Sequence, residues 1–164
     1  MAILNEARTR SSSFLFGAFV TTVALAAFSL PAAASLGDGV DSITLDQQQM
    51  NATVQTAQVG SYTVYTLTSP SGTVVREYLS SGGVVFAVAW QGPFVPSMQQ
   101  ILDTYFQAYS SAANLQRESH VGRRPLNIQQ PGLVVQTGGH MRDYFGRAYV
   151  PSLLPSGVNP NDVR

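Results

Sequence analysis

Three stretches in the middle of the chain carry the β-branched and aromatic residues that are typical of strands. They span Ser61–Ser69, Thr73–Ser80 and Val84–Trp90. The segments between them, Pro70–Gly72 and Ser81–Gly83, contain the glycines that tight hairpins require. Three successive strands joined by short turns predict an antiparallel meander. The third stretch is apolar at both odd and even positions, which indicates a central strand covered on both faces.

The pattern changes to a helical period after two prolines in the segment 91–96. Ser97 followed by Gln100 has the spacing of a capping box. Apolar side chains then recur on one face, at Met98, Ile101, Leu102, Tyr105, Tyr109 and Ala112, with Phe106 widening the stripe. The sequence therefore predicts one amphipathic helix from Ser97 to about Leu115, with its apolar stripe packed on the sheet.

A second group of strands follows this helix. A short strand is expected near residues 126–129, and a hairpin is expected from residue 133 to Val150 with Gly138 and Gly139 as its turn. Gly146 is expected to interrupt the second arm of that hairpin as a bulge. The β-β-β-α-β-β order predicts an α+β fold, in which one long amphipathic helix packs on a five-stranded antiparallel β-sheet.

The N-terminal region has the organisation of a secretory signal peptide. Arg8 and Arg10 precede the apolar run Phe14–Leu30, and Ala32 and Ala34 form a small-x-small cleavage site. We therefore expect cleavage after Ala34. The alternative is an uncleaved membrane anchor, because the run approaches the ~20 apolar residues of a spanning helix.

Cleavage at that site divides the chain into three parts. Residues 1–34 form the signal peptide, residues 35–58 form an exposed polar lead-in, and residues 59–164 form a single α+β domain. We expect the mature chain to be exported to the periplasm without a stable membrane span. A location outside the cell, or anchoring by the uncleaved segment, is the alternative.

The composition narrows the range of functions. The chain contains no cysteine and no lysine, which excludes disulfides, thiolate chemistry, Schiff-base chemistry and a P-loop lysine. Beyond residue 34 it has seven arginines against eight acidic residues, a net charge near −1. This near-neutral balance argues against nucleic acid as a partner, since nucleic acid requires clustered positive charge. Neither a cofactor nor a metal ion is expected from the residues.

Two segments of the chain resemble a known family. The segments "REYLSSGGVVFAVAWQGPFVP" (residues 76–96) and "GLVVQTGGHMRDYFGRAYVPSLLPSGV" (residues 132–158) are similar to DUF2844, a family of exported bacterial proteins of unknown function. The resemblance covers most of the mature chain. It implies one domain and export in a Gram-negative bacterium, and it implies no activity.

The polar residues near the C-terminus form the first candidate site. His140, Arg142 and Arg147 lie close together in a chain that is poor in charge, and we predict that they contribute to binding. If the arm is one strand, His140 and Arg142 share a face. The structural alternative pairs Arg142 or Arg147 with a cross-strand acid such as Glu77, and leaves His140 capping a turn.

Catalysis is the alternative function for the same residues. A hydrolytic enzyme would use His140 with a nearby carboxylate, either Asp143 or Glu118. The sequence contains no G-x-S-x-G nucleophile elbow, and no H-x-x-x-H or His-Glu spacing supports a zinc site. The residues therefore favour binding over catalysis.

Two further sets of side chains are binding candidates. Trp90 and Phe94, at the exit of the third strand, have the chemistry to stack on a ligand or to close the core at a corner. Arg117, Arg123 and Arg124 follow the helix and suit a small anionic ligand, although Arg117 could instead cap the helix C-terminus. We predict a binding or envelope-associated accessory module, whose partner is an envelope protein or a small anion. A self-associating structural component is a third possibility.

Overall fold

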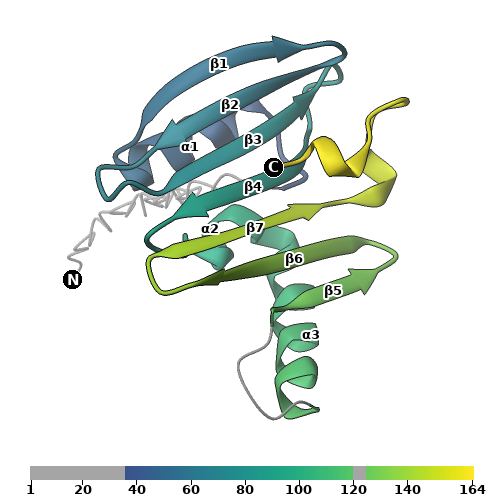
Figure 1. Cartoon of the computed structure of the whole chain (residues 1–164). Coiled ribbons are helices and arrows are strands. Elements are labelled where there is room, and N and C mark those ends of the chain that lie inside the picture. The colour runs from purple at the N-terminus through teal and green to yellow at the C-terminus, as the bar shows by residue number, and fades with distance from the viewer. Residues whose placement is uncertain (1–35, 120–124) are drawn as a thin grey trace, which may run out of the picture.

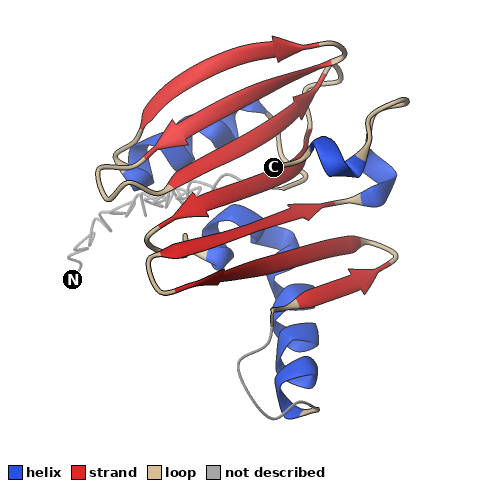
Figure 2. Cartoon of the chain, in the orientation of Figure 1, coloured by secondary structure: helices blue, strands red, loops and turns tan. Residues whose placement is uncertain are grey.

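The fold is a single antiparallel sheet with helices on one face. The computed structural model describes residues 36–119 and 125–164. Seven strands form the sheet in the order β1-β2-β3-β4-β7-β6-β5 (Figures 1 and 2). The strands are β1 (Thr53–Val59), β2 (Tyr62–Thr68), β3 (Val74–Ser80), β4 (Val85–Gly92), β5 (Asn127–Gln130), β6 (Leu133–His140) and β7 (Asp143–Tyr149). The α+β class and the antiparallel sheet are confirmed.

The sheet has seven strands, where the sequence predicts five in the main pattern. The additional strands are β1 and β5, and they form the two edges. Most of their residues are exposed. An edge strand that buries few side chains does not need the apolar alternation that identifies a strand in a sequence, which is why neither strand belongs to the predicted main pattern.

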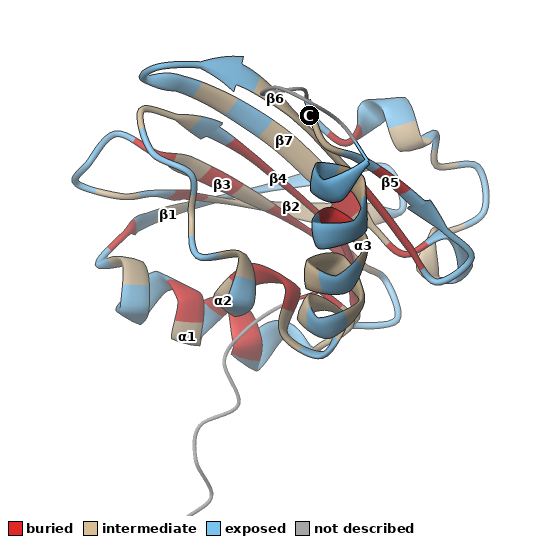
Figure 3. Ribbon diagram, turned by 90° about the horizontal axis from the view of Figure 1, so that it is seen from below, coloured by how far each residue is buried: buried red, intermediate tan, exposed pale blue. Residues whose placement is uncertain are grey.

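The chain crosses from one half of the sheet to the other through its helices. Strands β1 to β4 form a meander, and β7 then pairs with β4 so that the β5–β6–β7 group completes the sheet. Figure 3 shows the helices α1 (Val40–Met50), α2 (Met98–Leu102) and α3 (Phe106–Glu118) together on one side of the sheet. We call this side the helix face.

The C-terminal segment covers part of the other side, which we call the tail face. A small core there joins Tyr78, Phe86 and Ala89 of the sheet to Val163 of the tail. Strand β4 is buried from Val85 to Trp90, because one set of its side chains faces each layer. The prediction of a central strand covered on both faces is therefore confirmed.

The predicted single helix from Ser97 to Leu115 is wrong in one respect. Ser97 caps α2 as expected, since its Oγ accepts a hydrogen bond from the Gln100 backbone N–H at 3.3 Å. The helix is then interrupted by a 3-10 turn, η1 (Asp103–Tyr105), before α3 begins. Asp103 has a φ of +36°, a conformation that interrupts an α-helix and that L-residues rarely adopt. Among the described residues no helix is both long and apolar enough to cross a membrane.

The expectation of an exposed lead-in is also corrected. Leu36 is fully buried, Ile43 of α1 is 3% exposed, and β1 pairs with β2 along its whole length. Because α1 also carries many polar side chains, its sequence does not show that one face of the helix is packed on the core. The expected signal peptide lies outside the described residues.

The second hairpin has a different turn from the predicted one. Gly138 and Gly139 lie within β6, and the turn is formed by Met141 and Arg142, so that His140 pairs with Asp143. Arg142 adopts a left-handed φ of +67° there. Gly146 is not a bulge, since its pairing with both neighbouring strands is regular.

Candidate functional site

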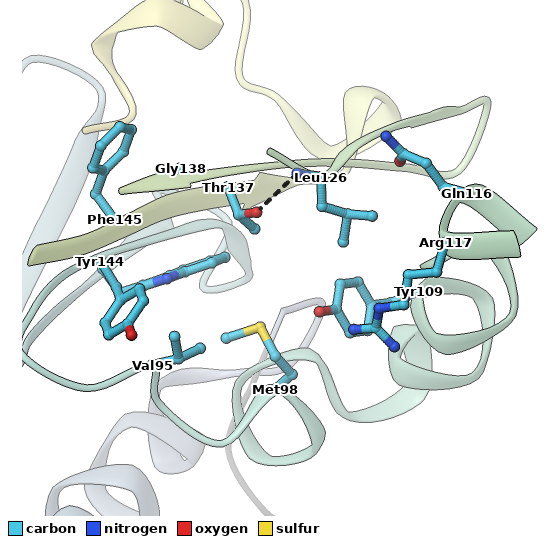
Figure 4. A pocket seen from close by; sticks show the side chains of 11 residues that line it. Val95, Met98, Tyr109, Gln116, Arg117, Leu126, Thr137, Gly138, Tyr144 and Phe145 are labelled. Carbon is cyan, nitrogen blue, oxygen red and sulfur yellow. Dashed lines mark hydrogen bonds between the residues drawn. The ribbon is translucent and has the colours of Figure 1, made fainter. Parts of the chain in front are cut away.

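A cavity of about 300 Å³ opens on the helix face, between α2, α3 and the β6–β7 hairpin (Figure 4). Its lining residues are Trp90, Val95, Met98, Tyr109, Gln116, Arg117, Leu126, Thr137, Gly138, Tyr144 and Phe145. Most of these side chains are apolar or aromatic, and one is a cation. This combination is typical of small-molecule sites, in which apolar walls bury the ligand and a few polar groups orient it.

Trp90 forms part of the cavity wall because a glycine lies opposite it. In the register of β4 and β7, Trp90 pairs with Gly146. A Cβ atom at position 146 would lie only 2.3 Å from the indole Cζ2 atom. The indole therefore lies across the backbone of β7 and is 2% exposed. Trp90 is therefore both a packed residue at the corner and part of the cavity wall, which is compatible with each of its two predicted roles.

Helix α3 contributes a tyrosine and an arginine to the cavity. Tyr109 and Arg117 are eight positions apart, so they lie on the same side of the helix. Burial raises the pKa of Tyr109, and the positive charge of Arg117 acts in the opposite direction. The Arg117 guanidinium donates a 3.3 Å hydrogen bond to Asn114 Oδ1 and has no carboxylate partner among the described residues. Its positive charge is available to an acidic ligand group.

The hairpin side of the cavity supplies polar atoms. The Thr137 hydroxyl accepts a 3.2 Å hydrogen bond from the Leu126 backbone N–H, drawn as a dashed line in Figure 4. Tyr144 points into the space facing Val95 and Met98. Phe145, the next residue along β7, lies on the opposite side of the strand. Thr137 is thus held in place, while the Tyr144 hydroxyl has no hydrogen-bond partner within the described part of the chain.

The structure does not place the predicted His140 group in this cavity. His140 and Asp143 face each other across the hairpin turn, with 3.9 Å between Nε2 and Oδ2, and their side chains are 82% and 54% exposed. Arg142 lies in the turn itself. The expectation that His140 and Arg142 share a face of one strand is wrong, because the turn lies three residues later than expected and contains Arg142. The pair of His140 and Asp143 exists, but it is surrounded by solvent.

Arg147 lies on the tail face and binds the C-terminal segment. Its Nη1 donates to the carbonyl oxygens of Pro160 and Val163, at 2.7 and 3.3 Å. Its Nε donates to Gln136 Oε1 at 2.8 Å. The suggested pairing of Arg142 or Arg147 with Glu77 is therefore wrong, since Glu77 points to the helix face.

The remaining candidates are dispersed. Phe94 is 59% exposed and lines a separate shallow depression beside Ser97, so it does not share a surface with the buried indole of Trp90. Arg117 is in the last turn of α3, and of the predicted cations that the structure describes it alone lines the helix-face cavity. Arg123 and Arg124 lie outside the described residues.

Comparison with known proteins identifies the family. The family described as "Protein of unknown function (DUF2844)" matches residues 32–163, a span that contains every residue of the cavity. The chain belongs to this family. No curated protein and no solved structure matches the chain. The resemblance drawn from residues 76–96 and 132–158 is confirmed, and the family description assigns no activity.

This DUF2844 domain also contains a buried acidic pair that sequence reasoning missed. Asp46 of α1 and Glu77 of β3 are both fully buried, and the Gln100 side chain donates a hydrogen bond to Asp46 Oδ1. Burial raises the pKa of Asp46 to about 6. Burial, together with the charge of Asp46, raises the pKa of Glu77 to about 9. Glu77 is consequently protonated at neutral pH, and its carboxyl O–H is able to donate a hydrogen bond to the Asp46 carboxylate.

Two features of the sequence could have predicted that Asp46 and Glu77 are buried. Glu77 shares its strand parity with Val75 and Leu79, both buried, so its side chain is directed at the core. Asp46 lies three residues after Ile43 on the buried face of α1. The cavity residues Tyr109 and Tyr144 were not predicted as site residues either, although Tyr109 lies on the predicted apolar stripe.

Proposed function

We propose that this DUF2844 protein is an exported binding module whose helix-face cavity holds a small molecule with a flat apolar body and one acidic group. The observation that carries the proposal is the meeting of Trp90, Tyr109 and Tyr144 with Arg117 around one cavity. Rings provide large contact areas for an apolar body. A guanidinium without a carboxylate partner provides the complement for an acid.

The dimensions of the cavity support a small ligand. Its volume of about 300 Å³ lies at the lower end of the range for small-molecule sites. Val95, Met98 and Leu126 supply aliphatic walls between the rings. Because Arg117 comes from the end of α3, the ligand's acidic group would point toward that helix terminus while its apolar body lies against Trp90.

The geometry favours binding over hydrolysis. Among the residues that the structure describes, none that lines the cavity is an aspartate, a glutamate or a histidine. A general base must lie within hydrogen-bond reach of the proton that it removes. His140 and Asp143 lie at an exposed hairpin turn instead, and Glu118 is exposed at the end of α3. We therefore keep hydrolysis only as the alternative function.

Export is part of this proposal. Its support is the apolar run Phe14–Leu30 with the small residues after it, and the family match begins at residue 32, beyond that run. The proposed place of action is the periplasm. The intact mass of the protein recovered from the envelope fraction tests this: cleavage after Ala34 is expected, and a full-length mass would contradict it.

The ligand proposal is testable with the only tryptophan of the chain, which lines the cavity. We expect 3-phenylpropionate to change the Trp90 emission more strongly, and at lower concentration, than the uncharged 3-phenylpropanol does. Arg117→Gln should abolish this preference for the acid by removing the charge-assisted contact, a loss of about tenfold in affinity. Arg142→Gln removes the same charge at the exposed turn and should have no effect. Equal responses to both compounds, or no response, would refute the proposal.

A further inference from the structure

A second hollow, of about 410 Å³, lies on the opposite side of the sheet from the cavity described above. It opens on the tail face, where β3, β4, β7 and β6 run side by side next to the C-terminal segment. Its charged lining consists of Arg76, Arg147 and Arg164, and its neutral lining includes Gln91, Gln136 and Phe145. Three of the seven arginines beyond residue 34 therefore line one hollow.

Strand register explains how the hollow forms. Arg76 of β3 pairs with Ala89 of β4, Ala89 pairs with Arg147 of β7, and Arg147 pairs with Gln136 of β6. Neighbouring strands lie roughly 5 Å apart, so the two arginines stand on either side of a strand that carries only a methyl group between them. The small side chain of Ala89 leaves the space between the guanidinium groups unfilled.

The adjacent row of the sheet supplies an apolar wall. Phe145 pairs with Gln91 on one side and with Gly138 on the other. A Cβ atom at position 138 would lie 2.6 Å from the Phe145 Cζ atom, so the ring lies directly over the backbone of β6. Phe145 nevertheless remains 51% exposed, and its outer surface is open to a ligand.

No acidic side chain among the described residues neutralises the positive charge of the hollow. The lining contains no aspartate or glutamate side chain, and no ion pair between a carboxylate and any of the three arginines occurs among the described residues. Arg147 is held in place only by uncharged oxygen atoms, those of Gln136, Pro160, Asn161 and Val163. These bonds fix its position without removing its charge. The side chain of Arg76, which is half-buried, makes no hydrogen bond within the described part of the chain.

We propose that this tail-face hollow binds a ligand with two negative charges, carried either on one group, as in a phosphate monoester, or on the two groups of a dicarboxylate, with any apolar part of the ligand against Phe145. Guanidinium groups match such oxygens through paired, charge-assisted hydrogen bonds. Arg76 and Arg147 approach the group from two sides, and Gln91 can add a neutral donor. The two sites lie on opposite faces of the sheet and use different arginines, although Trp90, Thr137 and Phe145 line both hollows.

The test is a calorimetric titration of the mature protein with phenyl phosphate, inorganic phosphate and succinate at constant ionic strength. We expect phenyl phosphate to bind more tightly than inorganic phosphate, and Phe145→Leu to remove that difference. Arg76→Gln should weaken binding of phenyl phosphate by about tenfold, the effect of one charge-assisted contact. Arg142→Gln is the matched control, since it removes the same charge from the exposed turn, and it should leave binding unchanged.

Several outcomes would overturn the proposal. One is the absence of measurable heat with all three probes at millimolar concentration. Another is an equal loss of affinity in Arg76→Gln and Arg142→Gln, which would reduce the effect to the net charge of the protein. A stronger response to succinate than to phenyl phosphate would retain the site and assign it to dicarboxylates. Arg117→Gln should have no effect here, so failure of this proposal and failure of the helix-face proposal can be told apart.

Discussion

The indole of Trp90 and the backbone of Gly146 are in direct contact, and this contact separates the two hollows of the sheet. A Cβ atom at position 146 would meet the indole at 2.3 Å, a distance that real contacts do not reach. The ring lines the helix-face cavity, while Gly146 lines the hollow on the other face. The absence of a side chain at Gly146 thus determines how closely the indole of Trp90 approaches the sheet.

Gly146→Ala should destabilise the fold and displace Trp90. The new methyl group would overpack the contact with the buried indole of Trp90, at a cost of about 1–3 kcal/mol in the free energy of unfolding. Urea denaturation and the near-ultraviolet circular dichroism of the lone tryptophan measure both effects. Gly132→Ala is the control: a Cβ there meets nothing within 4 Å, so its stability should stay near that of the parent. Equal stability of the two variants would contradict the contact.

The buried pair of Asp46 and Glu77 should make stability depend on pH. Both carboxyl groups have folded-state pKa values raised above their unfolded values, to about 6 and about 9. The folded state therefore holds more protons than the unfolded state, so stability is fully present below the unfolded pKa values and falls as the pH rises. Between about pH 6 and 9 the folded state holds one proton more than the unfolded state. The free energy of unfolding should therefore fall by about 1.4 kcal/mol per pH unit in this range.

Glu77→Gln tests this pH dependence, because an amide cannot lose the proton. Its stability should vary much less over the alkaline range than that of the parent, as followed by urea denaturation at a series of pH values. Glu118→Gln, at the exposed end of α3, should keep the slope of the parent. A parent protein whose stability rises toward alkaline pH would show that the pair has the opposite effect.

Arg147 should attach the C-terminal segment to the sheet. Arg147→Met keeps the aliphatic stem but removes the hydrogen bonds to Pro160, Asn161 and Val163. We expect a loss of about 1–3 kcal/mol and faster amide exchange in residues 160–164, since several charge-assisted bonds disappear. Arg142→Met, in the exposed turn, should leave the exchange rates as they are. Unchanged exchange in both variants would mean that the tail is held by its apolar contacts and by the hydrogen bonds between Tyr78 and Arg164, without Arg147.

Asp103 offers a substitution that should stabilise the protein. Its φ of +36° costs energy for any residue with a Cβ, so Asp103→Gly should raise the free energy of unfolding by up to about 1 kcal/mol. Ser111→Gly lies inside the regular helix α3 and should lower it by a similar amount. Thermal denaturation compares the two. Destabilisation by both substitutions would show that the break between α2 and α3 is not strained.

Local patterns predicted the parts of the fold that depend on neighbouring residues. The β3–β4 meander, the central position of β4 and the Ser97 cap all follow from alternation, turn glycines and capping chemistry within a few positions. The hairpin turn was misplaced because Gly138 and Gly139 are strong turn residues by themselves. Only the register, which brings Phe145 over Gly138, shows why β6 contains glycine within the strand.

The site depends on contacts that the sequence does not reveal. Trp90 and Arg117 could be selected by residue type, but their convergence on one cavity requires the position of α3 relative to β7. The role of Gly146 is defined by an indole on another strand, so a bulge was the reasonable local interpretation. His140 and Arg147 were grouped by proximity in sequence, but the register of the hairpin places His140 beside the turn and Arg147 opposite Gln136, in the middle of β6.

The most direct test of the account is an NMR titration of the mature protein, with ¹³C-labelled methionine methyl groups, against 3-phenylpropionate. Met98 lines the helix-face cavity, whereas Met141 is 81% exposed in the hairpin turn and Met50 lies elsewhere, at the end of α1. The account predicts that the Met98 methyl resonance shifts on binding and shows contacts to the ligand ring, while Met50 and Met141 do not. Ring contacts to Met141, or no shift of Met98 at saturating ligand, would contradict it.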